Sequence, residues 1–407
     1  MATQTRTFKL PIKLGNDEFH ANRLEIYEFL REQHPVTKGK ISVINAWLVS
    51  RYDDVVALLK DPRLIRDRST ITGGSRLPFP LPKYVQRVAI SMILEDEPEH
   101  RRLRTLVHKA FTPRALSKIS GRVEEITHEL LDKAEAQGTV DLMQAYSLPI
   151  PVTVIREMLG VDQSDMDDLS NSISALTDGL SGFTMLKTFL FDLPKASSFV
   201  ETMIAKKREN PGDDILTALI QAEEDGERLS EDELVAMVFL LIIAGYETTV
   251  HLINNAVITL LTHQDQLERL RAEPELMDSA VEEILRFSGP IEGTKPFYPT
   301  EDIEYAGVTI PKGATVMPLL GAANRDPRQF ENPNVFDIAR TPNRHLGFSQ
   351  GIHYCLGAPL ARIETKIALK TLIDRNPNLK LAIPQEELKV QSFPAWVRHK
   401  AVPVILG

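Results

Sequence analysis

Apolar residues recur at helical spacing along most of the chain. Between Leu116 and Gln137, apolar positions such as Val123, Ile126 and Leu130 lie three or four residues apart, which predicts an amphipathic helix. Similar spacing and turn residues predict four further helices, over Asp53–Leu59, Glu99–Phe111, Met277–Phe287 and Ala358–Ile373.

The longest predicted helix runs from Ser230 to about Leu261. The Ser230 side chain can cap its first turn while Glu233 reaches back, which is a capping box. The helix is apolar nearly all round, which predicts a central, buried position. Its longest apolar run, from Val235 to Tyr246, is 12 residues. That is shorter than the roughly 20 residues that cross a bilayer, so we expect no membrane span.

Strand patterns are fewer and shorter. The segment Ile41–Val49 predicts a hairpin around Asn45. Three short β-prone runs follow near glycines, at Ile303–Tyr305, Val308–Ile310 and Thr315–Met317. The pattern therefore predicts a mainly α fold with a small β portion. No linker or shift in charge divides the chain, so we expect one domain over residues 1–407.

Composition and net charge exclude several classes of protein. Of 407 residues, 43% are hydrophobic and 25% charged, which is typical of a globular protein, and the net charge is −9. An acidic chain is a poor general binder of nucleic acid. The single cysteine, Cys355, excludes an internal disulfide and a multi-thiolate zinc site and favours a reducing compartment. The segment Met1–Leu10 lacks the apolar stretch of a signal peptide, so we expect a cytoplasmic protein.

Cys355 lies where loop residues lead into a predicted helix. Unpaired N–H groups and the positive end of the helix dipole lower the pKa of a thiol there and favour thiolate. The flanking Gly351 and Gly357 allow a flat molecule to approach the backbone, and Phe348 can shield the sulfur from water. Taken alone, such a cysteine is more often a small buried apolar residue.

The spacing Phe348-x-x-Gly351-x-His353-x-Cys355-x-Gly357 closely resembles the haem-binding signature of the cytochrome P450 family. The resemblance implies the cytochrome P450 fold, with haem b between the long central helix and the cysteine loop and helix. It makes the Cys355 thiolate the proximal ligand of the haem iron. The family usually has glycine where this chain has Ser349, and we expect an adjusted loop that still holds haem.

The segment Ala244–Thr249 carries unusual residues for an apolar helix. Glycine costs about 1 kcal/mol in a helix interior, and a buried carboxylate is costly unless paired. The segment resembles the family's oxygen-binding helix. By position, Ala244 and Gly245 leave room for O2, the co-substrate. Thr248 is the alcohol that hydrogen-bonds bound dioxygen or its water, and Glu247 is the acid that helps to deliver protons.

Glu283 and Arg286 form an ExxR pair, which alone is an ordinary helix ion pair. In the cytochrome P450 family this pair joins an arginine from a later meander, which by position is Arg340. The resemblance also implies cationic partners for the haem propionates, namely His100, Arg104, His345 and His353. The family usually has a further arginine where this chain has Phe297, and Lys295 is a possible substitute.

Seven Lys or Arg and no Asp or Glu lie between His100 and Arg122. This run can be a solvated helix face, or it can attract an acidic partner. The resemblance implies that a ferredoxin or flavodoxin docks there. We expect no reductase domain within 407 residues, so electrons should come from separate proteins, and we expect a monomer.

The resemblance implies a monooxygenase that inserts one atom of O2 into a hydrophobic small molecule. Glu292 can hold a basic group of a substrate or face water. Two alternatives stay open, a haem-thiolate protein that does not oxygenate and a hydrolase that uses Cys355 with His353. Candidate pocket residues are apolar and rich in phenylalanine; they are Phe79, Leu81, Val85, Val88, Ile90, Met92, Phe183, Met185, Phe189, Phe191, Ile291, Thr294 and Phe393–Trp396.

Overall fold

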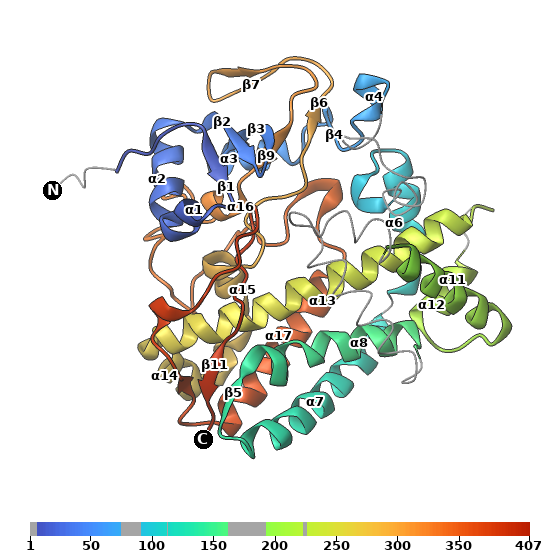
Figure 1. Ribbon diagram of the computed structural model, residues 1–407, viewed down its shortest axis with the longest axis vertical. Helices are drawn as coiled ribbons and strands as arrows, with labels where there is room; N and C mark the ends of the chain where they lie inside the picture. Colours follow the sequence, from blue (N-terminus) through green and yellow to red (C-terminus); the bar gives the residue numbers. More distant parts are fainter. Residues whose placement is uncertain (1–5, 75–90, 112, 162–192, 223–225) are drawn as a thin grey trace. The chain divides into compact units, whose positions relative to one another are not determined.

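The computed structural model describes residues 6–74, 91–111, 113–161, 193–222 and 226–407 (Figure 1). The chain divides into two compact units. Unit 1 comprises Met1–Ile71, Thr127–Ser147 and Thr248–Gly407, and unit 2 comprises Thr72–Ile126 and Leu148–Glu247. Helices predominate and the strands are short, so the prediction of a mainly α chain with a small β portion is confirmed. The single domain expected from the sequence stays a prediction.

A four-stranded sheet lies in unit 1, with strand order β1-β2-β3-β9. These strands are β1 (Ile12–Leu14), β2 (Val36–Ile41), β3 (Ile44–Val49) and β9 (Val316–Pro318). The β2–β3 pair is the expected hairpin, but its turn is at Ser42 and Val43 and not around Asn45, because Ile41 pairs with Ile44. Ser42 takes the left-handed conformation, with φ of 54°. The strand register that turns the apolar side chains toward the core determines where the turn lies. It outweighs the preference of asparagine for turn positions.

Short helices pack against this sheet in unit 1. Phe19, Tyr27 and Leu48 belong to one buried apolar cluster, which joins the sheet to α1 (Asp17–Ala21) and α2 (Arg23–Gln33). The neighbouring elements are α3 (Tyr52–Leu58), β4 (Leu64–Ile65), α4 (Ser69–Thr72) and β6 (Tyr298–Pro299). The predicted strands β7 (Ile303–Tyr305) and β8 (Val308–Ile310) are confirmed, and the structure shows that they pair in antiparallel fashion.

Unit 1 contains further helices and strands. They are β5 (Thr139–Asp141), α14 (Gln264–Ala272), α15 (Met277–Ser288), α16 (Leu320–Ala323), α17 (Ala358–Arg375), β10 (Lys380–Leu381) and β11 (Pro403–Ile405). The helices α15 and α17 pack together. Both match helices predicted from apolar spacing.

Unit 2 contains η1 (Met92–Leu94), α6 (Glu99–Ala110), α8 (Pro149–Leu159), α11 (Leu193–Glu209) and α12 (Ile215–Gln221). Of these, α12 packs against α6, α8 and α11. The long helix α7 (Pro113–Glu135) begins in this unit. It begins at Pro113 and not at Leu116 as expected, because proline is well tolerated at the first position of a helix, where its missing N–H has no partner in any case.

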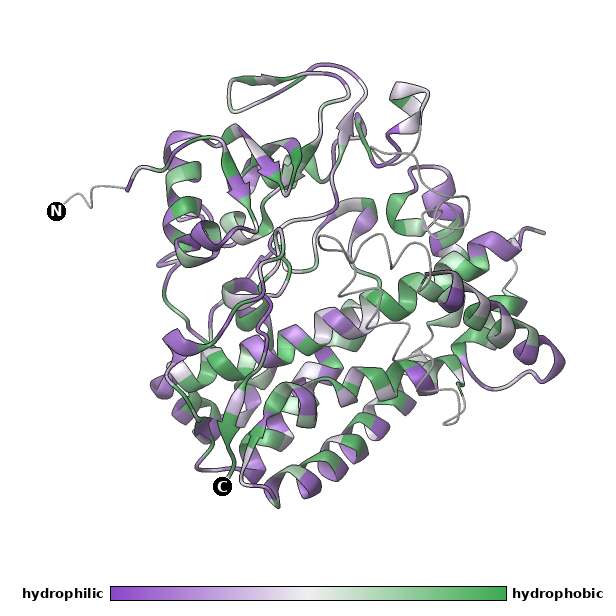
Figure 2. Cartoon of the chain, viewed as in Figure 1, coloured by the Kyte–Doolittle hydropathy of each residue, from purple (hydrophilic) through white to green (hydrophobic). Residues whose placement is uncertain are grey.

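The helix α13 (Glu231–Thr262) is the long apolar helix that the sequence predicts. Its capping box is confirmed, because Ser230 N donates to Glu233 Oε2 at 2.7 Å and Glu233 N donates to Ser230 Oγ at 3.4 Å. Figure 2 shows α13 largely in the colour of apolar residues, with polar residues interspersed. Within the described part of the chain, α13 alone has the length and hydropathy to cross a membrane, but 67% of that stretch is buried, as in a core helix.

Candidate functional site

The cysteine loop places Cys355 just before the first turn of α17. Its N–H donates to Phe348 O at 3.0 Å, and its carbonyl accepts from Ala358 N at 3.4 Å. Cys355 is a partly exposed residue, unlike a small core residue. The thiol thus lies at the N-terminus of an 18-residue helix. The N–H groups and dipole of that terminus favour the thiolate, which is the form that binds metals.

Backbone conformation explains the residues that flank Cys355. Gly351 has φ of +74°, and a Cβ there would lie 2.3 Å from Leu59 O, so only glycine fits. A Cβ at Gly357 would meet nothing within 4 Å, which leaves that side of the backbone open. Ser349 takes φ of 61°, and its N–H donates to Leu346 O at 2.8 Å. A left-handed serine costs about 1–2 kcal/mol, so the loop forms with some strain.

Phe348 is fixed beside the cysteine by a cation and an aromatic neighbour. The guanidinium carbon of Arg362 lies 4.6 Å from the centre of its ring. Arg362 also donates to both oxygens of Glu282, at 2.6 and 2.9 Å, so the cation itself is held in place. The ring of Tyr354 lies 6.4 Å from that of Phe348. Phe348 is buried, as its expected shielding role requires.

His345 contacts protein groups through both of its ring nitrogens. Its Nε2 lies 3.0 Å from Glu282 Oε2, and its Nδ1 accepts from Gly347 N at 3.0 Å. Burial raises the pKa of Glu282, but hydrogen bonds from Arg362 and His345 outweigh it and lower the pKa to about 2. Because both ring nitrogens have protein partners, His345 orders the loop. Its role as a propionate partner stays a prediction.

Glu283 of the ExxR pair contacts both Arg286 and the meander arginine, Arg340, as predicted. Arg286 donates to the two oxygens of Glu283, each at 2.7 Å, and Arg340 Nε lies 3.1 Å from both. Asn343 Nδ2 and the Asp337 N–H also donate to Glu283, each at 3.1 Å. Glu283 is 0% exposed. A buried carboxylate with this many donors is well compensated, and it fixes α15 to the segment that leads into the cysteine loop.

The unit 2 residues of the predicted site lie on two helices. His100 is buried and Arg104 half-buried on α6, four residues apart and therefore on one face. Ala244, Gly245 and the buried Glu247 lie on α13. A Cβ at Gly245 would lie 2.9 Å from Ile155 Cδ1. Gly245 therefore lets α13 approach a protein side chain. The expectation that it leaves room for O2 stays a prediction.

The structure adds a buried acid that the sequence reasoning missed. Glu364 on α17 is 1% exposed, and burial raises its pKa to about 8 while the Thr249 side chain opposes the rise. Thr249 follows Thr248 on α13. The sequence offers a weak signal for Glu364, a carboxylate among apolar residues of a helix, two and a half turns after the cysteine.

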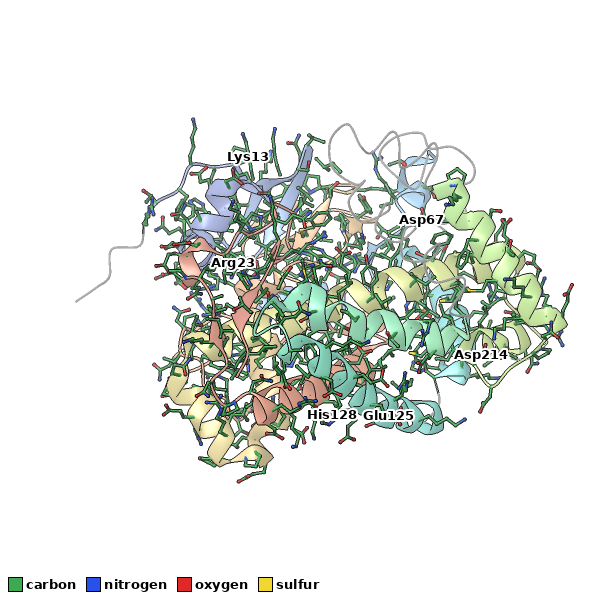
Figure 3. All side chains as sticks on the ribbon, turned by 60° about the horizontal axis from the view of Figure 1, so that its bottom comes forward. Lys13, Arg23, Asp67, Glu125, His128 and Asp214 are labelled. Carbon is green, nitrogen blue, oxygen red and sulfur yellow. The ribbon has the colours of Figure 1, made fainter. Side chains whose placement is uncertain are left out.

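Glu292 is a buried carboxylate that contacts α2. It is 7% exposed, so it does not face water. The Tyr27 hydroxyl donates to its Oε2 at 2.8 Å, and Arg23, labelled in Figure 3, lies 3.2 Å from its Oε1. Burial and the nearby carboxylate raise the pKa of Tyr27 well above its usual value. Glu292 thus joins α2 to the segment after α15, and the alternative that it holds a basic substrate group stays a prediction.

The basic run on α6 and α7 has acidic partners from other segments of unit 2. Arg102 pairs with Glu99 and with Glu233, and Lys118 pairs with Asp213. Arg101 lies 2.9 Å from Glu97 but keeps 78% of its side chain exposed. The local positive charge is therefore smaller than the sequence suggests. Among its described side chains, Arg101, Lys109 and Lys118 are exposed.

Most candidate pocket residues lie outside the described residues; these are Phe79, Leu81, Val85, Val88, Ile90, Phe183, Met185, Phe189 and Phe191. Met92 is buried in η1 of unit 2. In unit 1, Ile291 forms a β-bridge with Trp396, whose ring lies 5.8 Å from that of Phe393. These contacts bring the two unit 1 segments of the expected pocket together.

The residues of unit 1 fit a haem thiolate better than a metal held by side chains alone. No group of three or more His, Cys, Asp or Glu that could hold an ion is found among the described residues. A single accessible thiol at a helix N-terminus, next to an open glycine and a shielding phenylalanine, suits a metal whose other ligands come from a macrocycle.

Comparisons with known proteins agree with this site. Residues 195–393 match the family model Cytochrome P450. The chain is 37% identical over 404 residues to "Polyketide biosynthesis cytochrome P450 PksS" of Bacillus subtilis, covering 98% of this chain and 99% of the relative. It is 39% identical to "6-deoxyerythronolide B hydroxylase" of Saccharopolyspora erythraea, covering 92% and 94%. The structure of P450BioI with an acyl carrier protein ligated to hexadec-9Z-enoic acid is 36% identical, covers 96% of this chain and 99% of that one, and has a TM-score of 0.87.

The chain belongs to the cytochrome P450 family. It has the cytochrome P450 fold, and it is a monooxygenase that uses haem b, with O2 as co-substrate, to oxidise hydrophobic small molecules. This membership sets aside the cysteine hydrolase.

Proposed function

We propose that Cys355 is the proximal ligand of the haem iron. The supporting observation is its partial exposure at the start of α17, with its N–H bonded to Phe348 O at 3.0 Å. Bound haem would supply the oxygen activation. The α17 terminus stabilises the negative sulfur, and Phe348 limits the access of water to it. His100, Arg104 and His353 are the proposed propionate partners.

A change at Cys355 tests this assignment. Cys355→Ala should abolish the absorption band that the reduced, carbon monoxide-bound protein owes to its thiolate ligand. Tyr354→Phe is a matched control, since Tyr354 is the exposed neighbour of Cys355 and its ring stays aromatic. A band that persists in Cys355→Ala would contradict the assignment.

Glu247 and Thr248 are the proposed proton-delivering pair. Glu247 is buried on α13 and Thr248 is half-buried next to it. The carboxyl can take up a proton and the hydroxyl can pass it on, which is general acid catalysis with a relay. Ala244, one helical turn before Thr248, is proposed to leave room for O2.

The Thr248 hydroxyl is tested by the coupling of electrons to product. Thr248→Ala should release more hydrogen peroxide per electron consumed, because a proton reaches the reacting oxygen less often. Thr248→Ser keeps the hydroxyl and should restore most of the coupling. Equal coupling in all three proteins would remove Thr248 from the mechanism.

The proposed substrate is a sizeable apolar molecule such as a polyketide or a fatty acyl chain, free or on a carrier protein. The names of PksS, of 6-deoxyerythronolide B hydroxylase and of the P450BioI complex support this class. A panel of macrolides and of free and carrier-bound acyl chains, scored by the shift of the haem absorption band, tests it. No shift with either class, but a shift with small polar compounds, would overturn it.

The proposed electron donor is a ferredoxin or flavodoxin that docks on the exposed part of α6. The 78% exposure of the Arg101 side chain supports this docking face. The proposed setting is the cytoplasm, as a monomer without nucleic-acid or membrane partners. Analytical ultracentrifugation across a concentration series tests the monomer. A molecular mass that stays at the value of one chain would support it.

A further inference from the structure

Two segments of the expected substrate pocket pair with each other in unit 1. Ile291 forms an antiparallel β-bridge with Trp396. Beside this bridge, the Glu292 N–H donates to Ala395 O at 2.9 Å. These backbone contacts hold the two segments in one position relative to each other, so a movement of one segment is passed to the other.

The junction of these segments has little spare space. A Cβ at Gly293 would lie 2.8 Å from the Ala395 Cβ and 3.0 Å from the Met317 Sδ, so a side chain there would force a neighbour to move. Ala395 takes the left-handed conformation, with φ of 58°, which is costly for a residue that has a Cβ. A backbone in such a conformation persists only where the surrounding contacts hold it.

The side chain of Glu292 is fixed against α2. The Tyr27 hydroxyl donates to Glu292 Oε2 at 2.8 Å. A Cβ at Gly321 would lie 2.9 Å from Glu292 Oε1, so the absence of a side chain there makes room for the carboxylate. Arg23 Nε lies 3.2 Å from the same oxygen, but it is not aligned for a hydrogen bond with any residue that the structure describes. The Tyr27 hydroxyl is thus the well-oriented contact of this carboxylate.

Tyr27 is itself held firmly on α2. It is 1% exposed, and its ring makes an edge-to-face contact with Phe19, with 5.7 Å between the ring centres. Arg23, on the same helix, keeps 20% of its side chain exposed. A packed aromatic ring has few alternative positions, whereas a partly exposed arginine can adjust. Tyr27 therefore gives the carboxylate a fixed reference point on a helix that supplies none of the expected pocket residues.

We infer that Tyr27 is a positioning residue for substrate binding, which acts through Glu292 on the paired segments at Ile291 and Ala395. The inference rests on the proposed pocket and haem site. The hydrogen bond holds Glu292, whose backbone holds Ala395, and together they set the pocket wall that a sizeable apolar ligand meets. A displacement of about 1 Å in such a wall is enough to change how well a ligand fits. A ligand too small to reach the wall should not respond to Tyr27.

Two imidazole ligands of different size test this role on the holoenzyme without the natural substrate. Both can bind haem iron through a ring nitrogen and shift the haem absorption band, but only 1-dodecylimidazole carries an apolar chain into the pocket. Tyr27→Phe keeps the buried ring and removes the hydroxyl, so the Kd of 1-dodecylimidazole should rise about fivefold while that of imidazole stays the same. Tyr305→Phe is the matched control, because the Tyr305 hydroxyl also donates to a carboxylate, that of Asp61, at 2.9 Å.

Glu292→Gln separates the hydrogen bond from the charge. Glutamine keeps an oxygen that can accept from the Tyr27 hydroxyl, so most of the affinity for 1-dodecylimidazole should remain. A loss as large as that in Tyr27→Phe would assign the effect to the charge and contradict the inference.

The inference is also overturned if Tyr27→Phe binds 1-dodecylimidazole as tightly as the unmodified protein, if both imidazoles weaken alike, or if Tyr305→Phe gives the same loss as Tyr27→Phe. If imidazole shifts the haem band in none of these proteins, the haem site itself is contradicted. The failure of the inference and the failure of the proposed function are therefore distinguishable.

Discussion

Two groups of charged residues show how differently charge is used in this chain. In unit 1, Glu283, Arg286 and Arg340 form a buried group in which every donor has a fixed acceptor. In unit 2, Arg101 on α6 pairs with Glu97 while most of its side chain meets water. A buried ion pair is costly to break, whereas an exposed pair contributes about 0–1 kcal/mol. The first group should determine the fold, and the second should affect encounters with a partner.

The largest expected effect comes from breaking the buried group. Glu283→Gln leaves Arg286 and Arg340 without their carboxylate, and it should destabilise unit 1 by about 3–5 kcal/mol. We expect little folded, haem-containing protein, measured as the ratio of haem absorbance to protein. Glu304→Gln is the control, because Glu304 is exposed on β7. Normal haem content in Glu283→Gln would show that the group is not needed for the fold.

An intermediate effect should come from Glu364, a buried acid of unit 1. Burial raises its pKa from 4.5 to about 8, so the folded state holds a proton that the unfolded state releases in this range. The stabilisation is fully present below the unfolded pKa and is lost as the pH rises through the folded pKa. Between these limits, stability should fall by about 1 kcal/mol per pH unit because of this group.

Glu364→Gln should remove that pH dependence. Urea midpoints measured from mildly acidic to neutral pH should fall with rising pH in the unmodified protein and stay flatter in the variant. Glu386→Gln, at an exposed position, serves as the control. Identical pH profiles in the unmodified protein and Glu364→Gln would show that the carboxyl does not stay protonated.

The smallest effect on stability should come from the exposed charge. Arg101→Glu should change the free energy of unfolding by less than about 0.5 kcal/mol. It should nevertheless slow reduction by an acidic ferredoxin several-fold at low salt, an effect that fades as salt is added. Arg208→Glu makes the same change of charge elsewhere in unit 2, where Arg208 pairs with Glu231. Equal slowing by both variants would place docking away from Arg101.

The sequence determined the features that depend on neighbours along the chain. Apolar spacing predicted α13, α15 and α17, and the Ser230–Glu233 capping box formed as expected. The cysteine signature located the loop before α17. These features can be predicted from the sequence because helix faces, caps and tight turns depend on residues only a few positions apart.

Only the tertiary structure decided which charges are used within the protein and which can serve a ligand. Glu292 contacts Tyr27, which lies 265 positions away in the sequence, and His345 contacts Glu282, which lies 63 positions away. Strand pairing likewise brings Arg66 to Phe297. Neither periodicity nor a local motif encodes such partners, because strand register and helix packing set them after distant segments have met.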